Sequence, residues 1–333
     1  MKKISFIGIV ILLICMIICL VGYNTLVIQN ESKELKKIKN QNTAELEKER
    51  TYNETPTIYC IGDSLTMGQG SSSYPTALSA LTGFSVNKIG GKTNQTIDIA
   101  IKLGRIKIYT QNMTIPKTVK TIPITLYDEH GEKLDVLKGS LGSFKNIEID
   151  GISGTLSYDA TTQQHMFTRN DAGKRKAISS LTQIISKIPK IETKSIAIIF
   201  TGTYDSNISN GIFKTITYQR AIIKQLKVKK YIVVSLTSKR VFPIVNDMNI
   251  VLKEEHGEHF LDFRSYLLKS GLKDANIKAT RQDKKDLNQN YIPSSLLRDD
   301  RNGNSKFNQL LAEQLIKKMI ELKYIDEKQL KDK

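Results

Sequence analysis

Short apolar runs alternate with longer segments of helical periodicity through most of the chain. Four runs are apolar on both faces and end at glycine or polar residues, as buried strands of a parallel sheet do: Ile58–Ile61, Phe84–Ile89, Ser195–Thr201 and Tyr231–Leu236. Apolar residues recur at helical spacing over Ala177–Ile188, Ile216–Leu226 and Phe307–Leu322. Strands that alternate with helices predict an α/β fold, with a parallel sheet covered by helices on both faces.

One region breaks this rhythm. From Arg105 to Arg169 apolar and polar residues alternate with a period of two, and glycine- or aspartate-containing turns separate the short segments. This pattern predicts a β-rich insertion at residues 105–169. Insertions of this kind cover a site, grip a substrate or serve only as a structural flap, and the sequence leaves these roles open.

The first residues form a long uncharged run. Residues 4–28 contain no charged side chain, which is enough to cross a bilayer and longer than the apolar part of a secretory signal. No small-residue cleavage site follows, so we predict a cytoplasmic head and uncleaved transmembrane anchor at 1–28, a charged stalk or linker at 29–56 and the folded domain at 57–333. Lysines on both sides leave the positive-inside rule nearly neutral. The short basic head favours a single-pass cell-membrane protein with an extracellular domain.

The chain is strongly basic, with a formal net charge of +17. This charge favours an anionic neighbourhood such as lipid headgroups or an acidic cell-wall polymer. The lysines are spread along the chain, tryptophan is absent and no nucleic-acid-binding motif occurs, so nucleic acid is not a predicted partner. Nothing in the sequence defines the oligomeric state.

Cysteines and histidines give no sign of a bound metal. Cys60 is the only cysteine beyond the uncharged run, so no disulfide can form within the folded domain. His256 and His259 are closely spaced, but no cysteine or carboxylate cluster completes a metal site around them. We therefore predict no metal and no cofactor.

The segment TIYCIGDSL, Thr57 to Leu65, carries the clearest candidate chemistry. Its apolar run breaks at Gly62 and delivers Asp63 and Ser64 into a loop rich in glycine and serine. A serine raised on a strand-to-loop turn is how α/β enzymes present a nucleophile, although aspartate and serine are also good helix caps. After the next strand, Gly91 would let a backbone N–H approach a reacting centre, as an oxyanion donor must.

Four ordered blocks over roughly residues 57–322 resemble the GDSL serine esterases, the SGNH hydrolases. The blocks are Gly62-Asp63-Ser64-Leu65, Gly91-Lys92-Thr93, Gly202-Thr203-Tyr204-Asp205 and Asp299-Asp300-Arg301-Asn302. The resemblance implies a three-layer, flavodoxin-like fold for the domain at 57–333. It also implies a serine esterase that removes O-acyl groups, acetyl among them, from cell-surface glycans.

The resemblance assigns roles to five residues, and two of them depart from the family pattern. Ser64 would be the nucleophile, and its backbone N–H and that of Gly91 would face the oxyanion. Tyr204 stands where the family has its third oxyanion donor, an asparagine. Asn302 stands where the family has its histidine base, and an amide cannot take a proton from serine at neutral pH. Asp299 then has no imidazole to orient, and loss of such a base costs on the order of 10⁶ in kcat.

Three hypotheses follow from these substitutions. The chain is a membrane-anchored serine esterase acting through Ser64, or a degenerate hydrolase that binds a glycan or protein partner without turnover, or an enzyme with a relocated base. The candidate for that base is His165 in the insertion, since His130 lies in a predicted hairpin turn. Because two signature residues are replaced, the second hypothesis is favoured slightly over the first.

Overall fold

The computed structural model describes residues 33, 36–37, 55–68, 72–139, 144–187, 191–205, 210–239 and 242–330. Pro56–Lys333 form one compact unit. The predicted anchor at 4–28 lies outside the described residues, as does most of the stalk at 29–56, so the membrane location stays a prediction. Within the described ranges, no helix combines the length and the apolar character needed to cross a bilayer.

A five-stranded sheet in the order β13-β12-β11-β1-β2 forms the centre of the unit, and all its neighbouring strands pair in parallel. Its strands are β1 (Ile58–Gly62), β2 (Val86–Gly90), β11 (Ile196–Phe200), β12 (Lys230–Val234) and β13 (Phe260–Leu261). Numbered along the chain, these strands lie in the order 2-1-3-4-5, which is the flavodoxin-like arrangement. The four predicted strands are confirmed, with ends that shift by no more than two residues.

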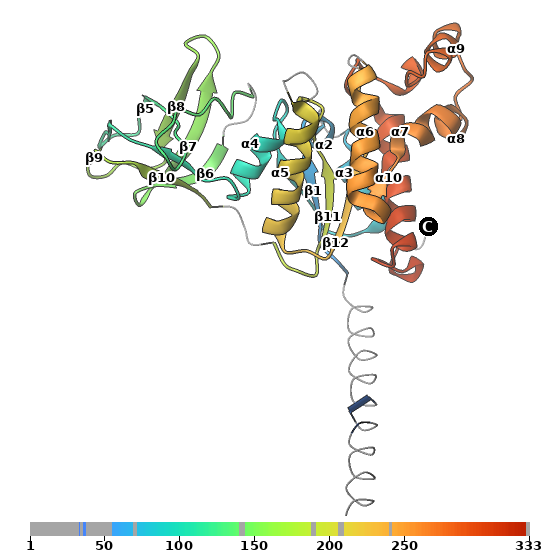
Figure 1. Ribbon diagram of the computed structural model, residues 1–333, viewed down its shortest axis with the longest axis horizontal. Helices are drawn as coiled ribbons and strands as arrows, with labels where there is room; N and C mark the ends of the chain where they lie inside the picture. The colour runs from blue at the N-terminus through green and yellow to red at the C-terminus, as the bar shows by residue number, and fades with distance from the viewer. Residues whose placement is uncertain are drawn as a thin grey trace, which may run out of the picture. The chain divides into compact units, whose positions relative to one another are not determined.

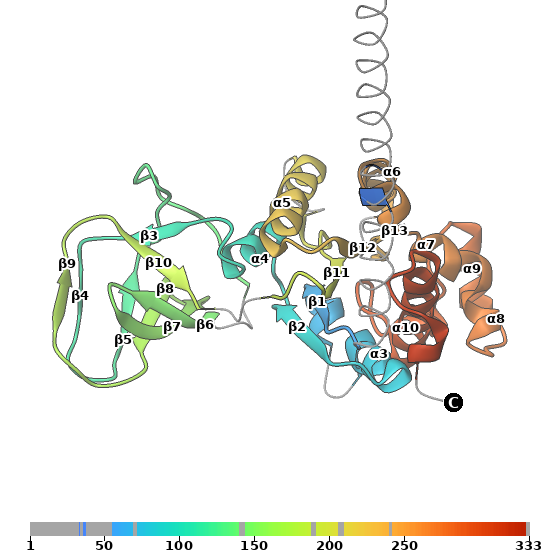
Figure 2. The same cartoon turned by 90° about the horizontal axis from the view of Figure 1, so that it is seen from below.

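Helices cover both faces of this sheet (Figures 1 and 2). In β1, Ile58 and Cys60 point into one apolar core and Ile61 into the other, as the two-residue period of a strand requires. The first core is closed by α3 (Tyr74–Thr82), α7 (Phe263–Tyr266) and α10 (Ser305–Glu321), and the second by α4 (Thr96–Lys102), α5 (Gly211–Leu226) and α6 (Phe242–His256). The predicted three-layer parallel α/β fold is therefore confirmed.

Several shorter elements complete the unit. They are α2 (Ser64–Met67), α8 (Leu272–Asp274), α9 (Arg281–Asn288), a π-helical turn at Leu267–Gly271, and 3₁₀ turns at Gly257–His259, Ser294–Leu296 and Glu327–Gln329. The segment from α7 to the 3₁₀ turn at Ser294–Leu296 leads into α10. The order in the chain therefore places Asp299–Asn302 directly before the last helix.

The insertion forms a second group of strands beside the central sheet (Figure 2). Its apolar core also includes Ile101 of α4. Its six-stranded antiparallel sheet has the order β3-β10-β6-β7-β8-β5, and β4 and β9 pair as a second, two-stranded sheet. The strands are β3 (Ile108–Thr110), β4 (Met113–Ile115), β5 (Thr121–Ile124), β6 (Phe144–Ile149), β7 (Ile152–Asp159), β8 (Gln164–Arg169), β9 (Lys176–Ile178) and β10 (Thr182–Ser186). The β-rich segment thus continues beyond Arg169 to Ser186.

The predicted helix at Ala177–Ile188 is wrong. This stretch forms β9 and β10, and β10 pairs with β3 on one side and β6 on the other. Ile184 is buried whereas Ile185 is 40% exposed, which is the alternation of a strand with one covered face. A short apolar run fits the period of a helix or that of a strand. Here pairing with the edges of β3 and β6 makes the run a strand.

Candidate active site

Ser64 lies at the turn between β1 and α2. Asp63 caps this short helix by accepting a hydrogen bond from the backbone N–H of Leu65 at 3.1 Å. A Cβ at Gly62 would lie 2.2 Å from the Thr66 hydroxyl oxygen, so the tight turn requires glycine. The capping role of Asp63 and the half-buried position of Ser64 at the strand end therefore both follow from this turn.

The carboxyl of Asp63 is completely buried beneath Ser64. Burial raises its pKa from 3.8 to about 7, although the hydrogen bond from Leu65 acts in the opposite direction. The nearby carboxylate of Asp205 adds to the increase. The folded protein therefore disfavours the ionised form of Asp63 around neutral pH.

Replacing Asp63 with asparagine is expected to make stability less sensitive to pH. A raised carboxyl pKa means that the unaltered protein loses stability as the pH rises from about 4 to about 7, whereas an amide keeps the capping oxygen without a charge. The advantage of Asp63→Asn should grow across this window to the order of 2–4 kcal/mol and level off above it. Urea unfolding at pH 5, 6, 7 and 8 measures this, and a difference that is constant with pH would contradict it.

Tyr204 is the contact partner of Ser64. Its hydroxyl donates to the Ser64 Oγ at 3.4 Å. The two residues meet because Gly62 pairs with Phe200, so the loops after β1 and β11 leave the sheet at the same edge. The guanidinium of Arg301 lies over the Tyr204 ring, 5.0 Å from its centroid, in a cation–π contact. Arg301 lies within the fourth sequence block, but nothing in the sequence predicted this contact with Tyr204.

The Asp299–Asn302 loop is closed by its own hydrogen bonds. Asp299 accepts from the backbone N–H groups of Arg301 and Asn302 and from the Asn302 side-chain amide, each at 2.9 Å. Partial burial alone would raise the pKa of Asp299, but these hydrogen bonds lower it. Because a carboxylate only accepts, the Asn302 Nδ2 must face it, and the Oδ1 is left buried without a partner in the described structure.

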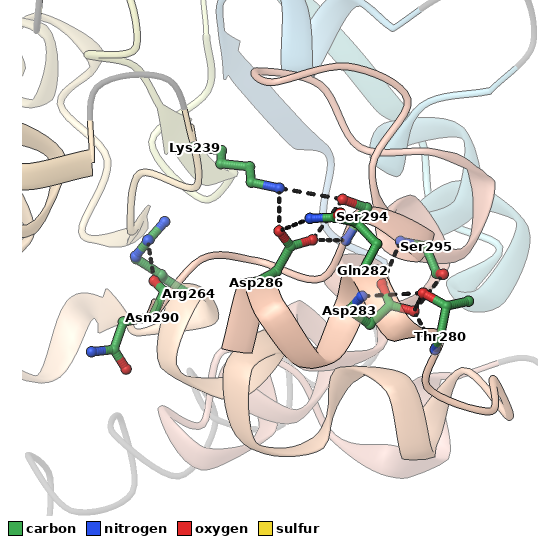
Figure 3. Close-up of polar contacts among 9 residues, drawn as sticks. All are labelled: Lys239, Arg264, Thr280, Gln282, Asp283, Asp286, Asn290, Ser294 and Ser295. Atoms are coloured by element: carbon green, nitrogen blue, oxygen red, sulfur yellow. Dashed lines mark hydrogen bonds and ion pairs between the residues drawn. The ribbon is translucent and has the colours of Figure 1, made fainter. Parts of the chain in front are cut away.

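Lys239, just beyond β12, fixes this loop to the sheet. Its backbone N–H donates to the carbonyl of Asp300 at 2.8 Å. Its ammonium donates to buried Asp286 in α9 at 2.7 Å and to the hydroxyl of Ser294 at 3.2 Å (Figure 3). Asp286 also accepts from Gln282 at 2.9 Å. The loop that carries Asp299 and Asn302 is thus supported by a buried ion pair that the sequence did not reveal.

Gly91 lies at the same edge of the sheet, on the other side of β1. It follows Gly90, which pairs with Gly62 and has a φ of +150°. A Cβ at Gly90 would lie 1.7 Å from the Gly62 carbonyl oxygen, so only glycine allows this approach. Gly91 is itself buried, and a Cβ there would lie 2.3 Å from the Asn94 side-chain oxygen.

A buried polar cluster supports Gly91 from below. Lys102 donates to the Asn94 side chain at 2.8 Å, and Asp98 accepts from the backbone N–H of Leu137 at 2.6 Å. Burial lowers the pKa of Lys102 and raises that of Asp98. Asp98 and Lys102 are four residues apart in α4 and so lie on one helix face, whereas Asn94 precedes the helix.

Asp205, in the third block, forms hydrogen bonds that hold two helices together. Its buried carboxylate accepts from the backbone N–H of Thr96 at 3.1 Å and from the hydroxyl of Thr215 at 2.7 Å. These contacts join the starts of α4 and α5 beneath the site. Burial raises the pKa of Asp205 despite these donors.

All four histidines lie in the described part of the chain, and the contacts that they form there are with residues other than Ser64. His165 in β8 is buried, and its Nε2 contacts the carbonyl of Val136 at 2.7 Å. His256 contacts Gln219 at 2.9 Å, and its burial lowers its pKa to about 4. His259 contacts the hydroxyl of Tyr324 at 2.7 Å, and His130 is exposed in a hairpin. No contact in the described part of the chain gives Ser64 an imidazole base.

The described residues also contain no group of three or more histidine, cysteine or carboxylate side chains arranged to hold a metal ion. The site at the carboxyl edge of the sheet is therefore assembled from Ser64, Gly91, Tyr204 and the Asp299–Asn302 loop. Its chemistry is that of hydroxyls, amides, the Asp299 carboxylate and the Arg301 guanidinium.

Comparison with known proteins gives only distant structural likenesses. Models of known protein families and curated proteins yield no match. A protein from Desulfitobacterium hafniense DCB-2, described as lipolytic and of the G-D-S-L family, is 14% identical over 80% of this chain and 99% of its own, with a TM-score of 0.42. A G-D-S-L lipolytic family member from Veillonella parvula DSM 2008 is 10% identical over 78% and 96%, with a TM-score of 0.42. The acetyl xylan esterase AlAXEase is 10% identical over 78% and 98%, with a TM-score of 0.41. Because these TM-scores are below 0.5, the site is assigned from its own contacts.

Proposed function

We propose that this chain is an SGNH-type hydrolase-like protein whose Ser64 site binds an O-acylated glycan without appreciable turnover. The observation that carries the proposal is the 2.9 Å hydrogen bond from Asn302 Nδ2 to Asp299. It supports a site in which an amide replaces the imidazole that the carboxylate of a catalytic triad orients. An amide has no nitrogen that is basic at neutral pH, so Ser64 has no general base in this arrangement.

The remaining groups suit binding rather than proton transfer. With the Tyr204 hydroxyl donating to its Oγ, Ser64 can turn its own hydrogen toward the carbonyl oxygen of an acyl group. Although Asp299 and Asp300 lie in the same loop, Arg301 stacks on Tyr204 and brings to this edge a guanidinium that can pair with an anionic substituent of a glycan. The basic net charge of the whole chain acts in the same direction.

A slow serine esterase is the second candidate, and one observation favours it. Asp299 and Asn302 keep the hydrogen-bond pattern of an acid and the residue it orients, while Ser64 is only half-buried. A water molecule held at this loop would then have to act as a weak base. The two candidates differ in whether hydrolysis depends on Ser64.

The full-length chain and its Ser64→Ala variant are expected to hydrolyse p-nitrophenyl acetate at equal rates. Binding is measured separately, by saturation-transfer NMR to the acetyl methyl groups of a partially O-acetylated oligogalacturonate. This transfer should be present in the unaltered chain and clearly weaker in Tyr204→Ala, because the contact partner of Ser64 is removed. Hydrolysis that disappears with Ser64 would favour the esterase. Absence of acetyl transfer in the unaltered chain would rule out the binding site.

A further inference from the structure

The β insertion contains a cavity of about 500 Å³, within the usual range for small-molecule sites. Strands and loops of the insertion alone line it. The side chains that matter chemically are Tyr127, Lys133, Lys138, Tyr158, Gln163 and His165. None of them belongs to the Ser64 site.

Aromatic and amide groups together give this cavity the character of a sugar site. Tyr127 and Tyr158 are half-buried and line the cavity, so each has apolar ring surface and a hydroxyl to offer a ligand. Gln111, Gln163 and Gln164 add side-chain amides, each of which donates and accepts hydrogen bonds. A pyranose ring presents apolar C–H faces and a rim of hydroxyls, which matches such a lining.

His165 adds a buried acceptor to the wall of the cavity. A carbonyl only accepts, so the 2.7 Å contact with Val136 requires the proton of the ring to be on Nε2. Burial lowers the pKa of His165, which keeps the ring neutral and leaves Nδ1 as an acceptor for a hydroxyl. The Tyr158 ring packs against this imidazole at 5.1 Å between centroids.

The charged side chains of the cavity are unbalanced. Lys133 and Lys138 face a single acid, Asp135, and Lys138 forms an ion pair with it. The lining therefore carries a net positive charge at neutral pH. A carboxylate or phosphate on the bound sugar would complete the charge balance.

The backbone around the cavity is held in costly conformations. Asn112 and Gln163 line it with φ values of +54° and +53°, in the left-handed region that non-glycine residues rarely occupy. Such conformations persist only where the surroundings fix them, and they are frequent at ligand sites. They support the cavity as a built feature of the insertion.

One wall of the cavity leads toward the Ser64 site. Lys138 lines the cavity, and the neighbouring Leu137 donates its N–H to Asp98 in α4 at 2.6 Å. At Gly139, a Cβ would lie 2.7 Å from the Thr93 hydroxyl oxygen and 2.9 Å from the Asn94 amide. The segment therefore runs from the cavity to the residues that follow Gly91.

We propose that this cavity is a subsite for an anionic glycan chain, whose ring stacks on Tyr158 and whose acidic substituent pairs with Lys133. The subsite lies one loop away from Gly91, so a polymer bound there is kept beside the Ser64 edge. The inference does not depend on turnover at Ser64, because none of the cavity residues belongs to that site.

The experiment uses the full-length chain and saturation-transfer NMR to sugar ring protons, with probes of both charge classes that carry no O-acyl group. The anionic probes are tetragalacturonate and a hyaluronan tetrasaccharide, and the neutral probes are maltotetraose and chitotetraose. We expect stronger transfer to the anionic probes. Tyr158→Ala should raise the Kd about tenfold, Tyr158→Phe should keep most of the affinity, and Lys133→Ala should weaken only the anionic probes.

Two matched variants locate the binding. Lys145→Ala removes an exposed lysine from β6 in the same sheet but outside the cavity, and Ser64→Ala alters only the other site. Both are expected to bind the probes as the unaltered chain does. Transfer to none of the four probes, a Kd unchanged in both Tyr158→Ala and Lys133→Ala, or binding lost in Ser64→Ala would each overturn the subsite. A preference for neutral probes would overturn the role of Lys133.

Discussion

Replacing Asn302 with histidine is expected to raise hydrolysis of p-nitrophenyl acetate by at least about 10²-fold, the lower end of what a placed general base contributes. Asp299 already accepts a side-chain N–H from position 302 at 2.9 Å, and an imidazole Nδ1–H can take over that hydrogen bond. The loop is fixed to β12 through the carbonyl of Asp300, so the new ring would not have to order it. The gain is measured as kcat/KM in the full-length chain.

Adding Tyr204→Asn to Asn302→His should raise the rate further, since an oxyanion donor is worth about 10²–10³ in kcat. The rate should rise with pH through the ordinary pKa range of histidine, near 6.5. Free imidazole also attacks this ester, so Asn87→His, at an exposed position in β2, is the matched control. The gain must vanish when Ser64→Ala is added to Asn302→His. A rate that survives this addition would show that Ser64 is not the nucleophile.

The strands of the central sheet were predictable because their apolar runs place buried side chains on both faces of the sheet. Ile198 and Ile199 are both fully buried although they point in opposite directions, and only a strand covered on two sides buries neighbours in this way. Gly62 and Gly90 mark the ends of two such strands, where the backbones come too close for a side chain. The turn that presents Ser64 was predictable from these local features.

Contacts between distant segments were not predictable in the same way. Arg301 meets Tyr204, and Leu137 of the insertion meets Asp98, through folds of the chain that no short pattern encodes. The strand at Thr182–Ser186 was missed for the same reason. It forms because it pairs with β3 and β6, which lie far away in the sequence. The position of a residue in the sequence assigns it to a block, but the residues that it contacts depend on how the chain packs.

Removal of the Asp286 carboxylate is expected to destabilise the protein by about 3–5 kcal/mol, the usual cost of breaking a buried ion pair. The Lys239 side chain is only 17% exposed and that of Asp286 only 1%, so Asp286→Ala would leave a buried ammonium without its acid (Figure 3). Urea unfolding measures the change. Asp247→Ala, which removes an exposed acid from α6, should stay within about 0.5 kcal/mol of the unaltered chain.

The pH dependence of this loss identifies its cause. Burial alone would raise the pKa of Asp286, but hydrogen bonds from Lys239, Ser294 and Gln282 lower it to about 2. A lowered pKa means that the carboxylate contributes its full stability above the ordinary value near 3.9 and loses it as the pH falls toward 2. The difference between Asp286→Asn and the unaltered chain should therefore be large at pH 7 and much smaller at pH 2. Because Lys239 also holds Asp300, the same variant should loosen the Asp299–Asn302 loop and weaken acyl-glycan binding. Equal destabilisation at both pH values would attribute the loss to packing rather than to charge.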